Sequence, residues 1–152
     1  MIDIGGGEGQ LLLDILAAHA EMKGVVFDLP VVQAAAAQLI GKYAMAERCQ
    51  FIAGDMFVGV PTGGDIYLLN KILHDWNDDK MVQILYRVRA QLSVHARLIV
   101  IERVMPMEVA AQSGRLVLAD LNMLCINEGA VRTEQEFAAL FEQAGFTLQN
   151  VI

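Results

Sequence analysis

The sequence predicts an α/β fold built on a mostly parallel, doubly wound sheet with helices on both faces. Short apolar runs alternate with segments of helical periodicity along the whole chain, which is the order of repeated strand–helix–strand units. Several of these runs also close on acidic or polar side chains, at the edge where such sheets bind ligands. We expect one domain over residues 1–152.

Composition and charge narrow the class of partner. The chain has 152 residues, of which 55% are hydrophobic and 19% charged, enough for one compact domain with a substantial core. Its net charge of −7 argues against nucleic acid and anionic membranes as partners and favours a small molecule. We expect Cys49 and Cys125 to be buried free thiols in a reducing compartment, the cytoplasm. No apolar run approaches the roughly 20 residues of a membrane span.

The first element is a buried strand that leads into the glycine turn Gly5–Gly9, and a helix is expected over Gln10–Ala20. This order presents backbone N–H groups and the positive end of a helix to a nucleotide or a similar polar ligand. A glycine turn also occurs wherever a chain reverses tightly, so the turn alone leaves both interpretations open.

The second strand is expected over Gly24–Pro30, with Asp28 at its carboxyl end. Asp28 follows the glycine turn by about twenty residues, the spacing at which a carboxylate accepts hydrogen bonds from ribose hydroxyls. The alternative is a solvated strand end, or a cap for the helix that begins near Val31.

A helix over Val31–Ala44 and a strand over Cys49–Ala53 follow, and the strand closes on Gly54–Phe57. Asp55 is placed to accept the amine of adenine while Met56 and Phe57 supply apolar faces to the ring. Equally, Met56 and Phe57 belong to the core, and the residues alone do not separate the two interpretations.

The remaining elements continue the alternation. We expect them at Asp65–Leu69 (strand), Asp78–Ser93 (helix), Arg97–Val104 (strand), Ser113–Cys125 (helix), Glu134–Ala144 (helix, with a capping box at Thr133) and Phe146–Ile152 (strand). Polar residues again follow the fourth strand, from Asn70 to Trp76, and Glu102 lies near the end of the fifth.

Five motifs occur in one order: Asp3–Gly9, Phe27–Pro30, Gly54–Phe57, Ile72–Trp76 and Gly129–Thr133. With them the chain resembles the S-adenosylmethionine-dependent O-methyltransferases, specifically the catalytic domain of the caffeic-acid, acetylserotonin and bacterial polyketide types. The resemblance implies a Rossmann-like class I methyltransferase fold. It also implies that S-adenosyl-L-methionine is the methyl donor and that the reaction needs no metal.

The resemblance assigns two groups of site residues. The donor site comprises Asp3, Gly5, Gly7, Asp28, Leu29, Asp55, Met56 and Asn70. His74 is the implied general base for a small-molecule hydroxyl acceptor, and Glu102 is the acid that orients it. An imidazole suits that task because its pKa is about 6.5. The implied acceptor pocket includes Asp75, Met123 and Asn127.

The chain departs from the family pattern in three respects. Asn70 stands where many relatives have a lysine aimed at the donor, and Val131 stands where many have a second glutamate. Relatives usually begin with a helical domain that forms a homodimer and end with one further strand. We therefore expect a catalytic domain without the dimerisation domain and the last strand of the sheet, with apolar surface exposed.

Two other functions remain open. An inactive or truncated domain that only binds the donor is favoured by Asn70, Val131 and the absent helical domain. A nicotinamide dinucleotide domain shares the glycine turn and the acid at the strand end, but it explains none of the stretch from His74 to Trp76.

Overall fold

The structure is a computed structural model that describes residues 1–106, 114, 118, 120, 123 and 129–152. The chain divides into two compact units. The first unit comprises Met1–Asn70 and Ala90–Val100. The second comprises Lys71–Arg89 and Ile101–Ile152.

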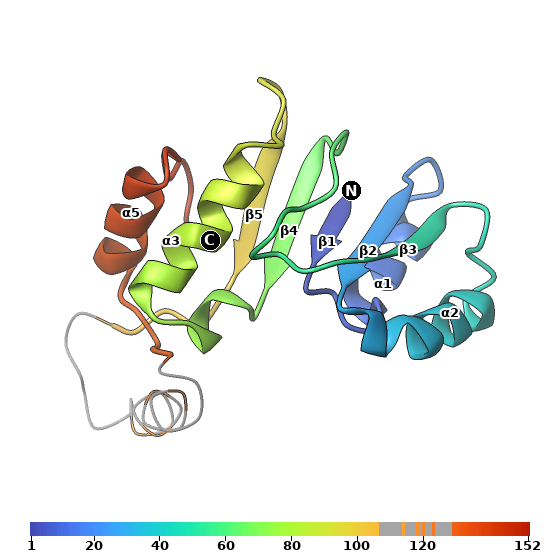
Figure 1. Cartoon of the computed structure of the whole chain (residues 1–152), viewed down its shortest axis with the longest axis horizontal. Coiled ribbons are helices and arrows are strands. Elements are labelled where there is room, and N and C mark those ends of the chain that lie inside the picture. The colour runs from blue at the N-terminus through green and yellow to red at the C-terminus, as the bar shows by residue number, and fades with distance from the viewer. Residues whose placement is uncertain (107–113, 115–117, 119, 121–122, 124–128) are drawn as a thin grey trace. The chain divides into compact units, whose positions relative to one another are not determined.

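A parallel sheet forms the centre of the first unit. Its strand order is β3-β2-β1-β4-β5 (Figure 1), and the strands are β1 Ile2–Ile4, β2 Gly24–Asp28, β3 Cys49–Ala53, β4 Ile66–Asn70 and β5 Arg97–Ile101. The pairs β1–β2, β1–β4 and β2–β3 are parallel. The Arg97 N–H donates to the Asp65 carbonyl at 2.9 Å, and the Lys71 N–H donates to the Ile101 carbonyl at 2.9 Å. The first bond joins the start of β5 to the start of β4, and the second joins the end of β4 to the end of β5. The two strands therefore also run parallel.

Helices α1 (Gln10–Ala18) and α2 (Gln33–Lys42) supply apolar side chains to one core cluster of the first unit. Its buried members come from both helices and from β2 and β3: Leu12, Leu13, Leu16, Val26, Ile40 and Cys49. A Cβ on Gly24 would lie 2.9 Å from the Leu12 side chain, so glycine lets α1 approach the sheet closely. Cys49 is a buried free thiol, as predicted, and burial raises its pKa.

The second unit holds helices α3 (Asp78–Arg89) and α5 (Glu134–Gln143), which pack side by side (Figure 1). The hydroxyl of Tyr86 donates to the Gln143 carbonyl at 3.0 Å and ties the two helices together. The predicted capping box is confirmed, because Thr133 and Glu136 satisfy each other's backbone N–H groups. A short 3-10 turn, η2 (Leu73–Asp75), precedes α3.

Several element boundaries differ from the predictions. The segment Pro30–Val32 forms a separate 3-10 turn, η1, before α2, and α2 ends early because Ala44 has a φ of 54°. The fifth strand stops at Ile101, which leaves Glu102 just beyond it. The predicted helix over Ser113–Cys125 lies largely outside the described residues, and Cys125 itself is not among them.

The predicted strand over Phe146–Ile152 is wrong, because this segment pairs with no strand in the part of the chain that the structure describes. The Phe146 N–H instead donates to the Phe141 carbonyl at 2.8 Å, and Gly145 has a φ of 79°. This arrangement closes α5 in a Schellman-type turn, so Phe146 belongs to the end of a helix.

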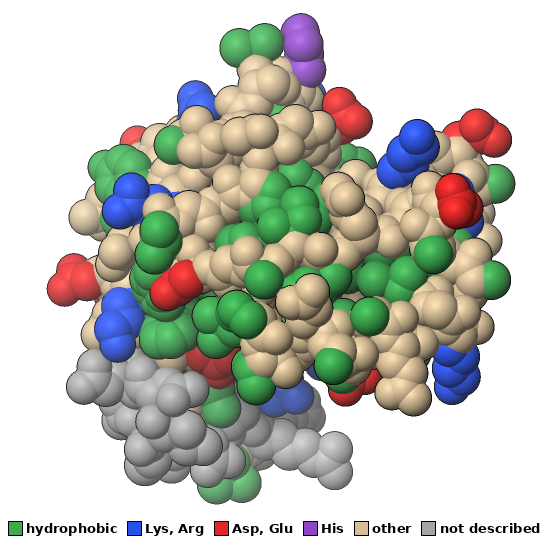
Figure 2. Space-filling view, turned by 45° about the vertical axis from the view of Figure 1, so that its right-hand side comes forward, with side chains coloured by type: hydrophobic (Ala, Val, Ile, Leu, Met, Phe, Trp, Pro, Cys, Tyr) green, Lys and Arg blue, Asp and Glu red, His purple; other side chains and the backbone are tan. Residues whose placement is uncertain are grey.

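The surface of the described residues is mixed in character. On the face drawn in Figure 2, lysine and arginine side chains lie scattered among acidic ones, with hydrophobic side chains between them. Ile99, on the terminal strand β5 of the sheet, is 41% exposed. None of the described helices is long and apolar enough to cross a membrane.

Candidate active site

The glycine turn connects β1 to α1 with a conformation that requires glycine. Gly5, Gly7 and Gly9 have φ values of 68°, 58° and 89°, in the left-handed region that residues with a Cβ rarely adopt. The Gly5 N–H donates to the Phe27 carbonyl at 2.8 Å, which binds the turn to the end of β2. A Cβ on Gly6 would lie 2.7 Å from Asp3 Oδ2. The backbone therefore approaches the Asp3 carboxyl more closely than a side chain would permit.

Asp28 fixes this turn through both of its carboxylate oxygens. Oδ2 accepts the Gly7 N–H at 2.7 Å, and Oδ1 accepts the Leu29 N–H at 2.6 Å. Each oxygen has a second lone pair, so Asp28 can still accept two ligand hydroxyls. The N-cap residues of the two helical segments that follow, Leu29 and Val32, form no side-chain cap bond.

Asp3 is a buried acid without a full set of partners. It is 2% exposed, and its Oδ1 has no hydrogen-bond partner among the described residues. Burial, with a smaller contribution from the negative charge of Asp28, raises the pKa of Asp3 to about 7. An unsatisfied buried acceptor beside a glycine turn is suited to a polar ligand, because the ligand would supply the missing donor.

The other predicted donor residues lie at the same edge of the sheet. The Gly54 N–H donates to the Asp28 carbonyl at 2.9 Å, which brings the end of β3 beside the end of β2. Asp55 is exposed and accepts the Phe57 N–H at 2.8 Å, and Met56 is half-buried. Asn70 closes β4. The structure thus brings all eight predicted donor residues to the carboxyl edge of one sheet.

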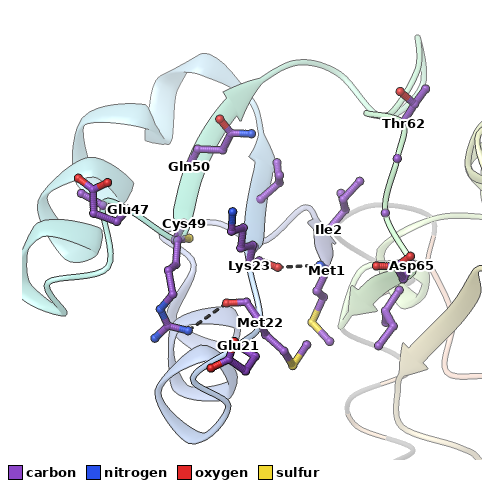
Figure 3. Close-up of a pocket in the computed structure, with 17 residues that line it drawn as sticks. Met1, Ile2, Glu21, Met22, Lys23, Glu47, Cys49, Gln50, Thr62 and Asp65 are labelled. Carbon is purple, nitrogen blue, oxygen red and sulfur yellow. Dashed lines mark hydrogen bonds between the residues drawn. The ribbon is translucent and has the colours of Figure 1, made fainter.

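A hollow of 720 Å³ lies at the opposite edge of the sheet (Figure 3). Its lining comes from the amino ends of the strands and the loops before them, including Met1, Cys49 and Asp65. There the terminal ammonium of Met1 donates to the Lys23 carbonyl at 2.8 Å, and Arg48 Nη1 donates to the Met22 carbonyl at 2.9 Å. None of the predicted site residues lines this hollow, so it is separate from the proposed donor site.

His74 and Glu102 form a hydrogen-bonded pair in the second unit. Nδ1 of His74 lies 2.6 Å from Oε2 of Glu102, and the side chains are 19% and 3% exposed. The second oxygen, Oε1, accepts the backbone N–H of Leu73 at 2.8 Å and that of His74 at 3.4 Å. The carboxylate therefore orients both the imidazole ring and the turn that carries it.

The Glu102 contact also fixes which nitrogen of His74 is basic. With the proton on Nδ1 donated to Glu102, Nε2 carries a lone pair that can accept a proton. Asp75 Oδ1 lies 3.4 Å from Nε2, and its side chain is 37% exposed. Met123 is half-buried, and Asn127 lies outside the described residues. Among the described residues, no three His, Cys, Asp or Glu side chains are placed to hold a metal ion.

Two residues contact the His74 turn that sequence reasoning did not assign to the site. Arg132 is 3% exposed and donates to the Trp76 carbonyl at 2.8 Å and the Leu73 carbonyl at 3.3 Å. A Cβ on Gly129 would lie 2.8 Å from the Asp75 carbonyl carbon. Both belong to the last motif quoted from the sequence, but its contact with residues more than fifty positions away is visible only in the fold.

Comparison with known proteins identifies the family. The chain is 38% identical over 152 residues to the phenazine O-methyltransferase PhzM of Lysobacter antibioticus, covering 100% of this chain and 44% of that protein. The structure of the mitomycin 7-O-methyltransferase MmcR matches with a TM-score of 0.91 and 37% identity, covering 98% of this chain and 43% of that one.

A third similar structure is that of NcsB1, an O-methyltransferase from neocarzinostatin biosynthesis in complex with S-adenosyl-L-homocysteine and 1,4-dihydroxy-2-naphthoic acid. It has a TM-score of 0.88 and 34% identity, covering 98% of this chain and 44% of that one. The chain thus spans less than half the length of each of these three relatives. The class I methyltransferase fold is confirmed by these structures. Since the family model of the O-methyltransferase domain matches residues 1–147, the chain belongs to the O-methyltransferase family.

Proposed function

We propose that residues 1–152 are the catalytic domain of an S-adenosyl-L-methionine-dependent O-methyltransferase. Its acceptor would be a hydroxyl group of a small aromatic or polyketide-like molecule. The single observation that carries this proposal is the 2.6 Å contact between His74 Nδ1 and Glu102 Oε2 in a chain of this family. The three related enzymes, named for phenazine, mitomycin and neocarzinostatin chemistry, support this acceptor class.

The carboxyl edge of the sheet fits the donor. The unpartnered Oδ1 of Asp3 can accept from the ammonium of the methionine portion, and the glycine turn leaves room for a backbone approach. The free lone pairs of Asp28 suit ribose hydroxyls, and Asp55 with Met56 suits adenine. When bound, S-adenosyl-L-methionine supplies a methyl group on a positively charged sulfur, which is reactive toward an oxygen nucleophile.

His74 would act on the acceptor. Nε2 accepts the hydroxyl proton, which makes the acceptor oxygen a stronger nucleophile, and Glu102 stabilises the imidazolium that forms. Because Glu102 is nearly fully buried and also holds the backbone of the turn, the imidazole is oriented before the acceptor binds. The residues Asp75, Met123 and Asn127 are proposed to contact the acceptor.

A second candidate, donor binding without transfer, is favoured by Val131. This buried, apolar residue stands where the resemblance implies a second glutamate, so it provides no further carboxylate for His74. The candidate and the main proposal both expect binding of S-adenosyl-L-methionine. They differ in whether a methyl group is transferred.

The experiment combines calorimetry with a transfer assay on the 152-residue chain. We expect S-adenosyl-L-methionine and S-adenosyl-L-homocysteine to bind and NAD⁺ not to bind. We also expect label from [methyl-³H]-S-adenosyl-L-methionine to appear in at least one member of a panel of phenols, naphthols and hydroxylated polyketides. Binding with no transfer across the panel would favour the second candidate, and tighter binding of NAD⁺ would refute both.

A further inference from the structure

The turn that carries His74 is too short to stabilise itself. The 3-10 turn η2 has three residues, Leu73–Asp75, and no side-chain cap of its own. A helix this short leaves N–H groups at its start and carbonyl groups at its end without internal partners. The position of His74 therefore depends on the groups that other segments bring to the two ends of the turn.

The buried carboxylate of Glu102 accepts from N–H groups at the start of the turn. The buried guanidinium of Arg132 donates to carbonyl groups of the turn and of the residue after it. Glu102 Oε1 accepts the N–H groups of Leu73 and His74 at 2.8 and 3.4 Å. The guanidinium of Arg132 donates to the carbonyls of Leu73 and Trp76 at 3.3 and 2.8 Å. A negative group at the start of a helical turn and a positive group at its end both complement its dipole.

The two segments that supply these caps are joined to each other. The Met105 N–H donates to the Arg132 carbonyl at 2.8 Å, and Met105 pairs with Thr133 in a parallel bridge. Two residues before Arg132, the Ala130 N–H donates to the His74 carbonyl at 3.0 Å. Glu102 and Arg132 thus reach the same turn from two paired segments, and a shift of either would move His74.

The burial of Arg132 argues that these carbonyl contacts matter more than its ion pair. Arg132 Nε and Nη2 lie 2.8 and 2.7 Å from Asp78 Oδ1, but the Asp78 side chain is 69% exposed and that of Arg132 is 4% exposed. A water-exposed carboxylate compensates poorly for a guanidinium removed from water. The remaining compensation comes from three backbone carbonyls, which are fixed dipoles: those of Leu73, Trp76 and Ala130.

We infer that Arg132 is a positioning residue for His74, holding the carbonyl of Leu73 in η2 and that of Trp76 just after it so that the imidazole keeps its bond to Glu102. The expected effect of Arg132 on turnover rests on the proposed function. The contact between Arg132 and the turn does not depend on that function. Arginine suits this role better than lysine, since its planar fork reaches two carbonyls in a fixed geometry.

The test compares Arg132→Lys with the parent and with Arg89→Lys. Arg89 is a matched control in the same unit, because its Nε also donates to a backbone carbonyl, that of Gly145, at 3.3 Å on an exposed surface. We expect Arg132→Lys to lower kcat by about 10- to 100-fold, the cost of a displacement near 1 Å, with the Kd for the donor changed less than about twofold. Arg89→Lys should match the parent in both quantities.

An NMR signal provides a readout that does not depend on activity. The proton between His74 Nδ1 and Glu102 should resonate far downfield and exchange slowly in the parent, because its hydrogen bond is short and buried. In Arg132→Lys we expect it to move upfield and exchange at least about tenfold faster, while thermal unfolding by circular dichroism verifies that the variant is folded. Arg132→Met, which removes every donor, should show a larger shift of the same signal.

The outcomes separate this inference from the proposed function. An unchanged His74 proton signal in folded Arg132→Lys would overturn the inference, whatever happens to kcat. A parallel loss of donor affinity and kcat would also overturn it, because positioning His74 predicts a change in kcat alone. If the parent transfers no methyl group but the signal still moves in Arg132→Lys, the proposed function fails and the contact role of Arg132 stands.

Discussion

Asp3 is a single residue with a measurable consequence for stability. Burial, and then the charge of Asp28, raises its pKa from 3.8 to about 7 in the folded chain. Between these two values the folded state holds a proton that the unfolded state has lost, so the free energy of unfolding falls as pH rises from about 4 to 7. The loss is complete above pH 7, and its upper bound is ~4 kcal/mol.

Asp3→Asn should remove this dependence. An amide has nearly the same shape but no charge, so we expect the variant to be more stable than the parent at pH 8 by ~1–4 kcal/mol and equally stable near pH 4. Urea unfolding at several pH values measures both. Asp65→Asn, a change at an exposed acid on the opposite edge of the sheet, is the control. If the free energy of unfolding changed with pH by the same amount in Asp3→Asn and in the parent, burial of Asp3 would not be the cause of the pH dependence.

Some individual residues of the candidate site can be predicted from the sequence, and others cannot. Asp28, Asp55 and His74 were identified as strand-end side chains and by resemblance, and the structure places each at the carboxyl end of a strand or in the turn after it. The bond from Gly7 to Asp28 and the unpartnered oxygen of Asp3 were not predicted. Both depend on distances between segments, which residue type and spacing do not encode.

At the scale of elements, the close contact between Gly129 and the His74 turn is the most sensitive feature. A Cβ at Gly129 would overlap the His74 carbonyl oxygen and would lie 2.8 Å from the Asp75 carbonyl carbon and 3.0 Å from its Cα, all in the backbone of the turn. Backbone cannot move aside as a flexible side chain does. No left-handed φ is required here, so the effect of a larger residue is purely steric.

Gly129→Ala should therefore displace η2. We expect kcat to fall by about 100-fold, as for a displacement near 1 Å. We expect the free energy of unfolding to fall by ~1–3 kcal/mol. Steady-state kinetics and urea unfolding measure the two effects. Gly59→Ala is the matched control, because a Cβ there meets nothing within 4 Å. Parent-like turnover in Gly129→Ala would show that the turn tolerates movement.

Element prediction succeeded where local signals were strong. The strand Cys49–Ala53 and the capped helix from Glu134 follow from an apolar run and from a capping box, and both were predicted at the observed start. Phe146–Ile152 failed because strand assignment needs a partner strand, and its apolar residues say nothing about whether one is present. The predicted end of α2 at Ala44 is also wrong, because nothing in the alanine-rich pattern indicates that Ala44 adopts a left-handed conformation.

At the scale of the whole molecule, the proposed donor residues and the proposed catalytic pair belong to different units of the chain. The eight proposed donor residues lie in the first unit, and His74 and Glu102 lie in the second. A change in the second unit should therefore alter turnover without altering donor affinity. Family and fold class were predictable from the order of five motifs, because a series of motifs is far more specific than any one of them.

The central claim is that His74, oriented by Glu102, removes the proton of the acceptor. The most direct measurement is the rate of methyl transfer by His74→Ala, with the donor Kd measured on the same preparation and His95→Ala, a change at an exposed histidine, as the control. The account predicts a rate about 10²–10⁴-fold below the parent and a donor Kd within about twofold of it. Transfer by His74→Ala at the parent rate would contradict the claim.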